Sequence, residues 1–330
     1  MSTRLEKMTN ALKHTEKTMT FQEYADNLVA LQKTATQLIM GEKFETGMRL
    51  EEAIAHMEYD VRKASLQKEE LVKQGMKALR TIEKEARICK AGLGAEREVV
   101  RALNYVTRPN TMTYQNVYVT DGQEESELDD IVLTNEGIII LEVKGTKEDI
   151  TITEDGRLIR GDSGCFGKGT LGEKMISKRK ILQHMLEKAL EEKGLDIPVV
   201  IDSMIVFSAP PKTYIKVEDR YHKEKYCFKS HVAARIDSYA GYAWYTKEQM
   251  EQLDVILQEF AAVRKGFEKA VDMMKLCRQF TAAMDVVYGE EKEKTSLWQQ
   301  WKKWWGRLVD SIGHSFQVTG EKKEIYSTSI

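Results

Sequence analysis

The sequence predicts an α/β protein with a mixed sheet in the middle of the chain and helical segments on both sides. Eleven of the 21 glycines fall between residues 92 and 172, and all four prolines lie between residues 109 and 211. Glycine and proline gather at the turns between strands, whereas both flanks carry apolar residues at helical spacings. We expect a helical arm at 1–90, a folded α/β domain at 91–245 and a helical extension at 246–330.

The composition is typical of a soluble protein with a highly charged surface. The 50 Lys and Arg residues nearly balance 52 Asp and Glu, which excludes a general basic field for coating nucleic acid. No uncharged apolar run reaches the ~18 residues of a spanning helix, and residues 1–10 lack the apolar stretch of a signal peptide. The four cysteines form no CxxC pair. We therefore expect a reducing, cytoplasmic compartment.

A narrow apolar seam runs along the N-terminal arm, at spacings of four and three with a slip in phase near Leu71. Its members are Leu50, Ile54, Met57, Val61, Ala64, Val72, Met76, Leu79, Ile82 and Ala86. Such a seam is typical of a coiled coil or a helical hairpin, and it packs either within one chain or on a second copy. Because the seam is too narrow to wrap a globular core, we expect a homo-oligomer formed through these helices.

The C-terminal extension ends in a tryptophan-rich segment. Thr246 and Gln249 form a possible capping box that opens one helix. Further on, residues 297–312 read LWQQWKKWWGRLVDSI, with four tryptophans on one face and basic residues beside them. This segment suits either a membrane interface or a groove on the protein. We favour docking on the protein, because the helix is short and has no neighbouring polybasic tract.

The segment from Glu127 to Gly145 reads as a hairpin with a two-residue turn at Asn135–Glu136. In that register Asp129 lies opposite Glu142, and Glu127 lies opposite Lys144. The second strand is apolar on both faces until it ends in charged residues, which is typical of a central strand. Two carboxylates and an amine are therefore expected on one face at the end of a buried strand.

This set of side chains predicts phosphodiester hydrolysis. Facing carboxylates repel each other, and a divalent cation removes the conflict. Their hard oxygen ligands favour Mg²⁺ or Mn²⁺, here on Asp129 and Glu142. A bound cation lowers the pKa of its water and stabilises charge on a phosphate. Lys144 can orient that water or neutralise the transition state.

A third acid precedes the hairpin. Residues 91–106 read as a helix opened by glycines, in which Glu96 shares a face with Val99, Val100 and Leu103. Glu96 is therefore expected to point inward, towards the sheet, whereas Glu98 does not share that face.

These residues together resemble the NERD (nuclease-related) domain, a branch of the PD-(D/E)xK nuclease superfamily. The matching residues are Glu96 in the helix, Glu127–Leu128–Asp129 in the first strand and Glu142–Val143–Lys144 in the second. The resemblance covers about 91–210 and implies an αβββαβ restriction-endonuclease-like core with metal-dependent nuclease chemistry. The chain departs from the family pattern at Asp130, where histidine is common. It also shows no Asn-Pro-x-x-Gln before the next helix, where Lys178 or Gln183 can substitute.

A basic group lies on the helix expected after the hairpin. It comprises Lys174, Lys178, Arg179 and Lys180, within a region of sixteen Lys and Arg against ten Asp and Glu between residues 157 and 235. Such a group binds a phosphate backbone or is simply a solvated helix face.

The leading hypothesis is a cytoplasmic Mg²⁺- or Mn²⁺-dependent nuclease acting on DNA. In it Asp129 and Glu142 are metal ligands, Lys144 is a catalytic cation and Glu96 is an auxiliary acid. One alternative is a catalytically silent nuclease fold that binds nucleic acid or serves as a scaffold. Another is a peripheral membrane protein anchored by the tryptophan-rich segment.

Overall fold

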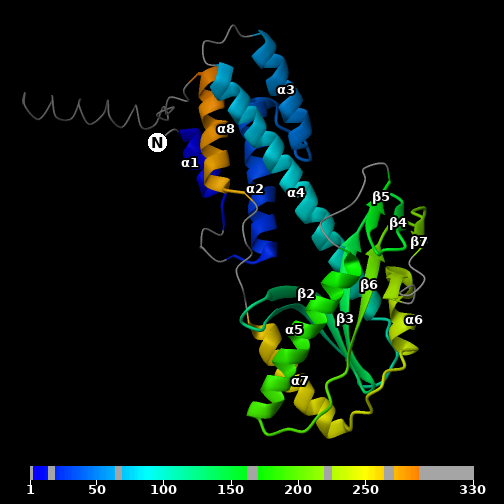
Figure 1. The fold of residues 1–330 in the computed structure, drawn as a ribbon. Helices are drawn as coiled ribbons and strands as arrows, with labels where there is room; N and C mark the ends of the chain where they lie inside the picture. Colours follow the sequence, from blue (N-terminus) through cyan, green and yellow to red (C-terminus); the bar gives the residue numbers. More distant parts are fainter. Residues whose placement is uncertain are drawn as a thin grey trace, which may run out of the picture.

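The computed structural model describes residues 3–13, 19–63, 69–161, 170–218, 225–263 and 271–289. It confirms the α/β class, with a mixed sheet and flanking helices (Figure 1). None of the helices in these ranges combines the length and the apolar character needed to cross a lipid bilayer. The tryptophan-rich segment 297–312 lies outside the described residues, so its predicted docking stays a prediction.

One half of the molecule is a helical bundle that joins both ends of the described chain. Its helices are α1 (Thr3–Asn10), α2 (Phe21–Met40), α3 (Leu50–Lys63), the first part of α4 (Glu69–Leu103) and α8 (Met273–Tyr288), with a short 3-10 turn at Gly41–Lys43. Thr20 starts α2 through a capping box: its hydroxyl accepts from the Glu23 amide, and the Glu23 carboxylate accepts from the Thr20 amide. Figure 1 shows α8, from the C-terminal part of the chain, alongside α4.

The described part of the apolar seam packs within this bundle. Its residues on α3 and α4 join one hydrophobic cluster with α2 and α8, and Leu79 and Ile82 are fully buried. Helices α4 and α8 approach each other so closely at Gly75 that a Cβ there would lie 2.2 Å from the Cβ of Ala283. Packing within one chain therefore accounts for the seam. Self-association of the arm remains a prediction that light scattering on the full chain can test.

Helix α4 runs without a break from the bundle to the sheet, which corrects the prediction of a separate, glycine-opened helix from residue 91. Gly92 and Gly94 lie inside the helix, where each costs roughly 1 kcal/mol relative to alanine. Contacts at both ends of the helix outweigh this cost: Cys89 belongs to the bundle cluster and Val99 to the sheet cluster. The predicted boundary at residue 90 thus falls in the middle of a helix.

The main sheet has the strand order β1-β2-β3-β6-β8. Its strands are β1 (Met112–Thr120), β2 (Glu125–Thr134), β3 (Gly137–Gly145), β6 (Ile201–Ser208) and β8 (Tyr226–Phe228). The first three pair antiparallel, whereas β6 runs parallel to β3 and β8 parallel to β6. A small second sheet contains β5 (Leu158–Arg160), β4 (Ile150–Ile152) and β7 (Ile215–Val217). As predicted, β3 is a central strand buried on both faces.

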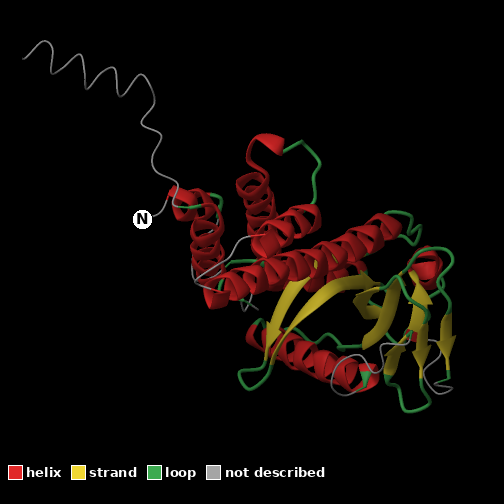
Figure 2. Cartoon of the chain, turned by 90° about the horizontal axis from the view of Figure 1, so that it is seen from above, coloured by secondary structure: helices red, strands yellow, loops and turns green. Residues whose placement is uncertain are grey.

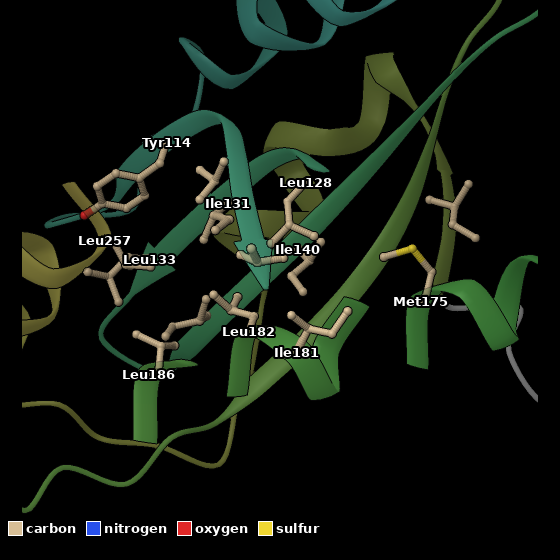
Figure 3. Packing of buried hydrophobic residues seen from close by; sticks show 14 of the residues in the cluster. Tyr114, Leu128, Ile131, Leu133, Ile140, Met175, Ile181, Leu182, Leu186 and Leu257 are labelled. Atoms are coloured by element: carbon tan, nitrogen blue, oxygen red, sulfur yellow. The ribbon is translucent and has the colours of Figure 1, made fainter. Parts of the chain in front are cut away.

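Helices cover both faces of the main sheet (Figure 2). One face packs on α5 (Leu171–Glu192) and α7 (Lys247–Ala262), through the side chains drawn in Figure 3. The other face packs on the end of α4 and on α6 (Val232–Asp237), which follows a 3-10 turn at Lys229–His231. The capping box predicted at Thr246 opens α7. Helix α7 packs on β1. It therefore covers the main sheet, although it begins after the predicted domain boundary at residue 245.

Candidate active site

The predicted hairpin is present, and near the turn its register is the predicted one. β2 pairs with β3 from Thr134 opposite Gly137 to Asp130 opposite Leu141. These pairs are the ones that a two-residue turn at Asn135–Glu136 imposes. The turn chemistry therefore fixes which side chains of the two strands share a face.

Beyond those pairs, β2 and β3 no longer pair with each other. Glu127 pairs with Tyr118 of β1, and Lys144 pairs with Phe207 of β6. The β2–β3 ladder ends at Asp130 opposite Leu141, so the prediction that Glu127 lies directly opposite Lys144 is wrong. Here β2 remains paired with β1, and β3 remains paired with β6. The β2–β3 ladder ends after Asp130 and Leu141, and we call this place the fork.

Asp129 stands at the fork. Its Oδ2 accepts a hydrogen bond of 2.6 Å from the backbone amide of Val143, in place of a bond between the two backbones. The alternation of β2 breaks here, because Leu128 and Ile131 both belong to the cluster under α5. Burial, with the nearby charge of Glu142 adding to it, raises the pKa of Asp129 to about 7. The two predicted carboxylates thus interact, although they are not a ladder pair.

Glu142 forms ion pairs with two lysines at once. Its Oε1 binds the ammonium of Lys144 on the same strand, and its Oε2 binds the ammonium of Lys178 from α5. The Lys178 ammonium also donates to the backbone carbonyl of Glu127, at 2.7 Å. Only 12% of the Glu142 side chain and 14% of the Lys178 side chain are exposed. Lys178 therefore ties β2, β3 and α5 together at the fork.

These pairs fix the charges of the site. Burial raises the pKa of Glu142, but the charges of Lys178 and Lys144 outweigh it and leave the pKa below its usual value. Burial lowers the pKa of Lys144, but the carboxylates of Glu142 and Asp129 outweigh it and leave that pKa above its usual value. At neutral pH, Glu142 is therefore a carboxylate and Lys144 an ammonium.

The basic group predicted on α5 does not lie on one face. Thr170 and Glu173 form a capping box at the start of the helix, and Lys178 follows in the site. Lys174 and Lys180 are exposed, and Arg179 is half-buried. Lys178 therefore belongs with the acids, whereas the other members of the group remain available to a phosphate backbone.

Close packing of α4 on the end of β3 brings Glu96 to the site. A Cβ on Gly145 would lie only 3.0 Å from the Cβ of Ala95, so the helix packs closely on the strand and any larger residue there would press against it. Glu96 is half-buried. Burial, and then the charge of Glu127, raise its pKa, while the charge of Lys144 opposes the rise. Glu96 thus lies within electrostatic reach of the fork residues.

Glu98 points elsewhere, as its position on the helix predicts. Its Oε2 accepts from the hydroxyl of Ser208 and pairs with the ammonium of Lys229. Glu98 therefore has a local structural role, and of the two glutamates only Glu96 interacts with the site.

Asp130 is the residue that the sequence reading did not assign to the site. Its side chain lies at the fork but is only 1% exposed. Burial, followed by the charges of Asp129 and Glu96, raises its pKa to about 8. The signal in the sequence was an acid, in place of the family's common histidine, just before the apolar run Ile131–Leu133.

The donor set suits a hard divalent cation. Within the described residues, no group of three or more His, Cys, Asp or Glu side chains is placed to hold a metal ion. Mg²⁺ needs no such cage, because it usually keeps several waters and takes one or two protein carboxylates together with substrate phosphates. Asp129 and Glu142 supply such oxygens, and the buried oxygens of Asp130 have no hydrogen-bond partner in the described structure. The residues present therefore fit Mg²⁺ or Mn²⁺.

Comparison with known proteins gives one match. Residues 91–208 match the family model described as the nuclease-related domain (NERD), which confirms the resemblance found from the residues. This segment contains Glu96, both strands of the hairpin and all of α5. The comparisons with curated proteins and with solved structures found no match.

Proposed function

We propose that this chain, which carries a nuclease-related domain at residues 91–208, is a metal-dependent nuclease that hydrolyses phosphodiester bonds in DNA. The observation that carries the proposal is the convergence of Asp129, Glu142, Lys144 and Lys178 at the fork. Buried charges are costly, and a chain that only had to fold would gain more from apolar side chains there. Perturbed ionisable groups gathered at one place are typical of an active site.

In this proposal the acidic and basic side chains have different roles. Asp129 and Glu142 would hold Mg²⁺ or Mn²⁺, and the ion would supply a water of lowered pKa and positive charge for the phosphate. Lys144 stays protonated at neutral pH, because its pKa lies above the usual value. It therefore orients the water and stabilises negative charge, and it does not remove a proton. Glu96 assists from α4 as an auxiliary acid.

Nucleic acid approaches along α5. Lys174 and Lys180 are exposed, and Arg179 lies beside them half-buried. These cations bind the phosphate backbone without reading sequence. The affinity for DNA should therefore fall steeply as salt is raised. A cytoplasmic location completes the proposal, and the described cysteines Cys89, Cys227 and Cys277, all free thiols, support it.

One alternative has an observation of its own. Both carboxylate oxygens of Glu142 are already paired with lysines, as in an ion-pair network that only stabilises a fold. In that case the chain is a catalytically silent nuclease fold that binds nucleic acid or serves as a scaffold. Cleavage and metal binding separate the two functions.

The test is incubation of the full chain with supercoiled, linear and single-stranded DNA and with RNA, with and without Mn²⁺. We expect cleavage of DNA that requires the metal. Glu142→Gln and Lys144→Ala should abolish cleavage, whereas Glu98→Gln, on the same helix as Glu96 but outside the site, should leave it intact. Cleavage that survives in Glu142→Gln, or none in the wild type, contradicts the proposal and leaves the scaffold function in its place.

A further inference from the structure

A groove lies between α3 and α4 of the helical bundle, outside the site at the fork. Its cavity has a volume of about 660 Å³, which is within the range of pockets that bind ligands. Val61 of α3 and Val72 and Met76 of α4 form an apolar floor. The charged side chains that line the groove are Glu58, Arg62, Glu69, Lys73, Lys77, Arg80 and Lys84.

The lining of this α3–α4 groove is positively charged, with five cations against two acids. Both acids are already held in ion pairs, which are Glu58–Arg80 and Glu69–Lys73. Arg62, Lys77 and Lys84 are exposed and form no ion pair among the described residues. Three cations along one groove are therefore available to an anion that is not part of the described chain.

Four of the cations form one stripe along α4, which we call the basic stripe. Lys73, Lys77, Arg80 and Lys84 follow one another at spacings of four, three and four, so they share a face of the helix. They span eleven positions, or about 16 Å of helix. The basic stripe is therefore longer than a single phosphate or carboxylate group and suits a run of phosphates.

The basic stripe lies on the side of α4 that meets the active strand. Seven positions after Lys84 the same helix face carries Ala91, whose carbonyl would lie 3.3 Å from a Cβ on Gly145. Gly145 ends β3 and directly follows Lys144 of the candidate site. Figure 1 shows α4 running from α3 to the strands. About 10 Å of helix thus separates the basic stripe from the contact of α4 with the end of β3.

A single strand of nucleic acid matches this combination of features. Proteins that bind single strands use a positively charged groove that follows the backbone, together with surfaces on which the bases lie. Unpaired bases can lie against an apolar floor, whereas the bases of a duplex are stacked inside it. The floor of Val61, Val72 and Met76 therefore favours a single strand over a duplex.

We propose that the α3–α4 groove binds a single-stranded stretch of the DNA substrate, on the side of α4 that leads to the fork. This inference rests on the proposed nuclease function and adds a substrate class to it. The substrate is DNA in which a single strand, such as an overhang or a flap, extends from the region that is cleaved.

The test measures binding of the full chain in EDTA to a labelled single strand of about 20 deoxythymidines, by fluorescence anisotropy. The double variant Lys77→Gln/Lys84→Gln should bind about tenfold more weakly, and the slope of log K against log salt should become shallower by about 1.4. The control Lys188→Gln/Lys247→Gln removes the same charge from exposed lysines of α5 and α7. It should stay within about twofold of the wild type.

A blunt duplex provides the second comparison, because the groove should not bind it. The Lys77→Gln/Lys84→Gln variant should bind this duplex within about twofold of the wild type. Both lysines are exposed, so its melting temperature should be unchanged. The inference is overturned if this variant binds the single strand as tightly as the control variant does, or if it loses single strand and duplex equally.

Light scattering tests whether the groove instead holds a second copy of the chain. A wild-type dimer that Lys77→Gln/Lys84→Gln dissociates, with binding of the single strand unchanged, makes the groove an interface between copies and overturns the inference. A monomeric wild type that binds the single strand through these lysines supports it.

Cleavage assays with Mn²⁺ keep the two proposals apart. For a duplex with a single-stranded arm, Lys77→Gln/Lys84→Gln should raise KM about tenfold and leave kcat unchanged. A wild type that cleaves DNA, with a KM that this variant does not alter, overturns the groove and leaves the nuclease intact. A wild type that binds the single strand through the groove but cleaves no nucleic acid overturns the nuclease function instead.

Discussion

The ammonium of Lys178 on α5 binds the one oxygen of Glu142 that Lys144 leaves free. One carboxylate is thus shared by a lysine two residues along its own strand and by another that follows 34 positions after the first. Each carboxylate oxygen keeps a second lone pair, so Glu142 can bind a cation beside its lysines or in exchange for one of them. An ammonium group released by such an exchange would be close enough to meet the incoming phosphate.

Replacing Lys178 tests this role. Lys178→Gln should lower DNA cleavage by about 10²-fold, as loss of a charge-stabilising donor does. It should also cost about 2 kcal/mol of stability, because Glu142 and the Glu127 carbonyl lose a charged donor. Lys188→Gln, an exposed position further along α5 that pairs with Glu192, should stay within about twofold in cleavage. Equal activity of the two variants in a plasmid-cleavage assay would place Lys178 outside the chemistry.

Asp129 should matter for metal and not for folding. In EDTA, Asp129→Asn is expected to melt at or above the wild-type temperature, since it removes a like charge near Glu142 and its amide oxygen still accepts from the Val143 amide. At an Mn²⁺ concentration of about 100 times Kd the wild type should gain about 2.7 kcal/mol, and the variant should not. A variant that unfolds, or that keeps the metal-induced gain, shows that Asp129 is structural.

The metal-free protein should lose stability as the pH rises from about 5 to about 8. Asp129 and Asp130 have folded pKa values of about 7 and about 8, above the value near 3.9 expected in an unfolded chain. Between these values the folded state binds more protons, so its stability falls with rising pH. The difference in melting temperature between wild type and Asp130→Asn, followed in EDTA, isolates one of the two groups. A difference that does not change with pH would contradict this.

Two glycines of α4 should respond in opposite ways. At Gly75 a Cβ would lie 2.2 Å from the Cβ of Ala283 and 2.9 Å from the carbonyl of Gln279, so Gly75→Ala should cost about 1–3 kcal/mol through overpacking. At Gly94 a Cβ meets nothing within 4 Å, so Gly94→Ala should stabilise the helix by about 0.5–1 kcal/mol. Urea denaturation of both variants measures this. A neutral Gly75→Ala would mean that α8 does not pack on α4 as described.

Local chemistry was enough to predict several elements. The turn at Asn135–Glu136 fixes the hairpin register, because turn length sets which residues pair. The capping box at Thr246 needs only residues within four positions of one another. The inward position of Glu96 follows from helical spacing alone. In each case the determining interaction is close in sequence, so the pattern is visible without the fold.

Contacts distant in sequence account for what was missed. Nothing near Gly92 shows that the bundle and the sheet hold one helix together across it. Nothing local shows that the β2–β3 ladder ends after Asp130 and Leu141 while β2 stays paired with β1 and β3 with β6, which lies more than 50 residues further along the chain. Lys178 reaches Glu142 only once α5 packs under the sheet. In the sequence Asp130 is only a departure from the family pattern, and its burial follows from the packing of the sheet.

The unbroken α4 has a mechanical consequence. With 35 residues, α4 is about 52 Å long. Glu96 lies near its C-terminal end, and α8 packs on its N-terminal part. A straight helix resists bending, so a load or a tilt applied to the bundle moves the carboxylate at the far end directly. A recombinant chain that begins at residue 91 would lose the bundle and start in mid-helix, with Ala95 and Glu96 in the second turn from a free helix end. The full chain, and not the matched segment alone, is therefore the unit in which this site keeps its shape.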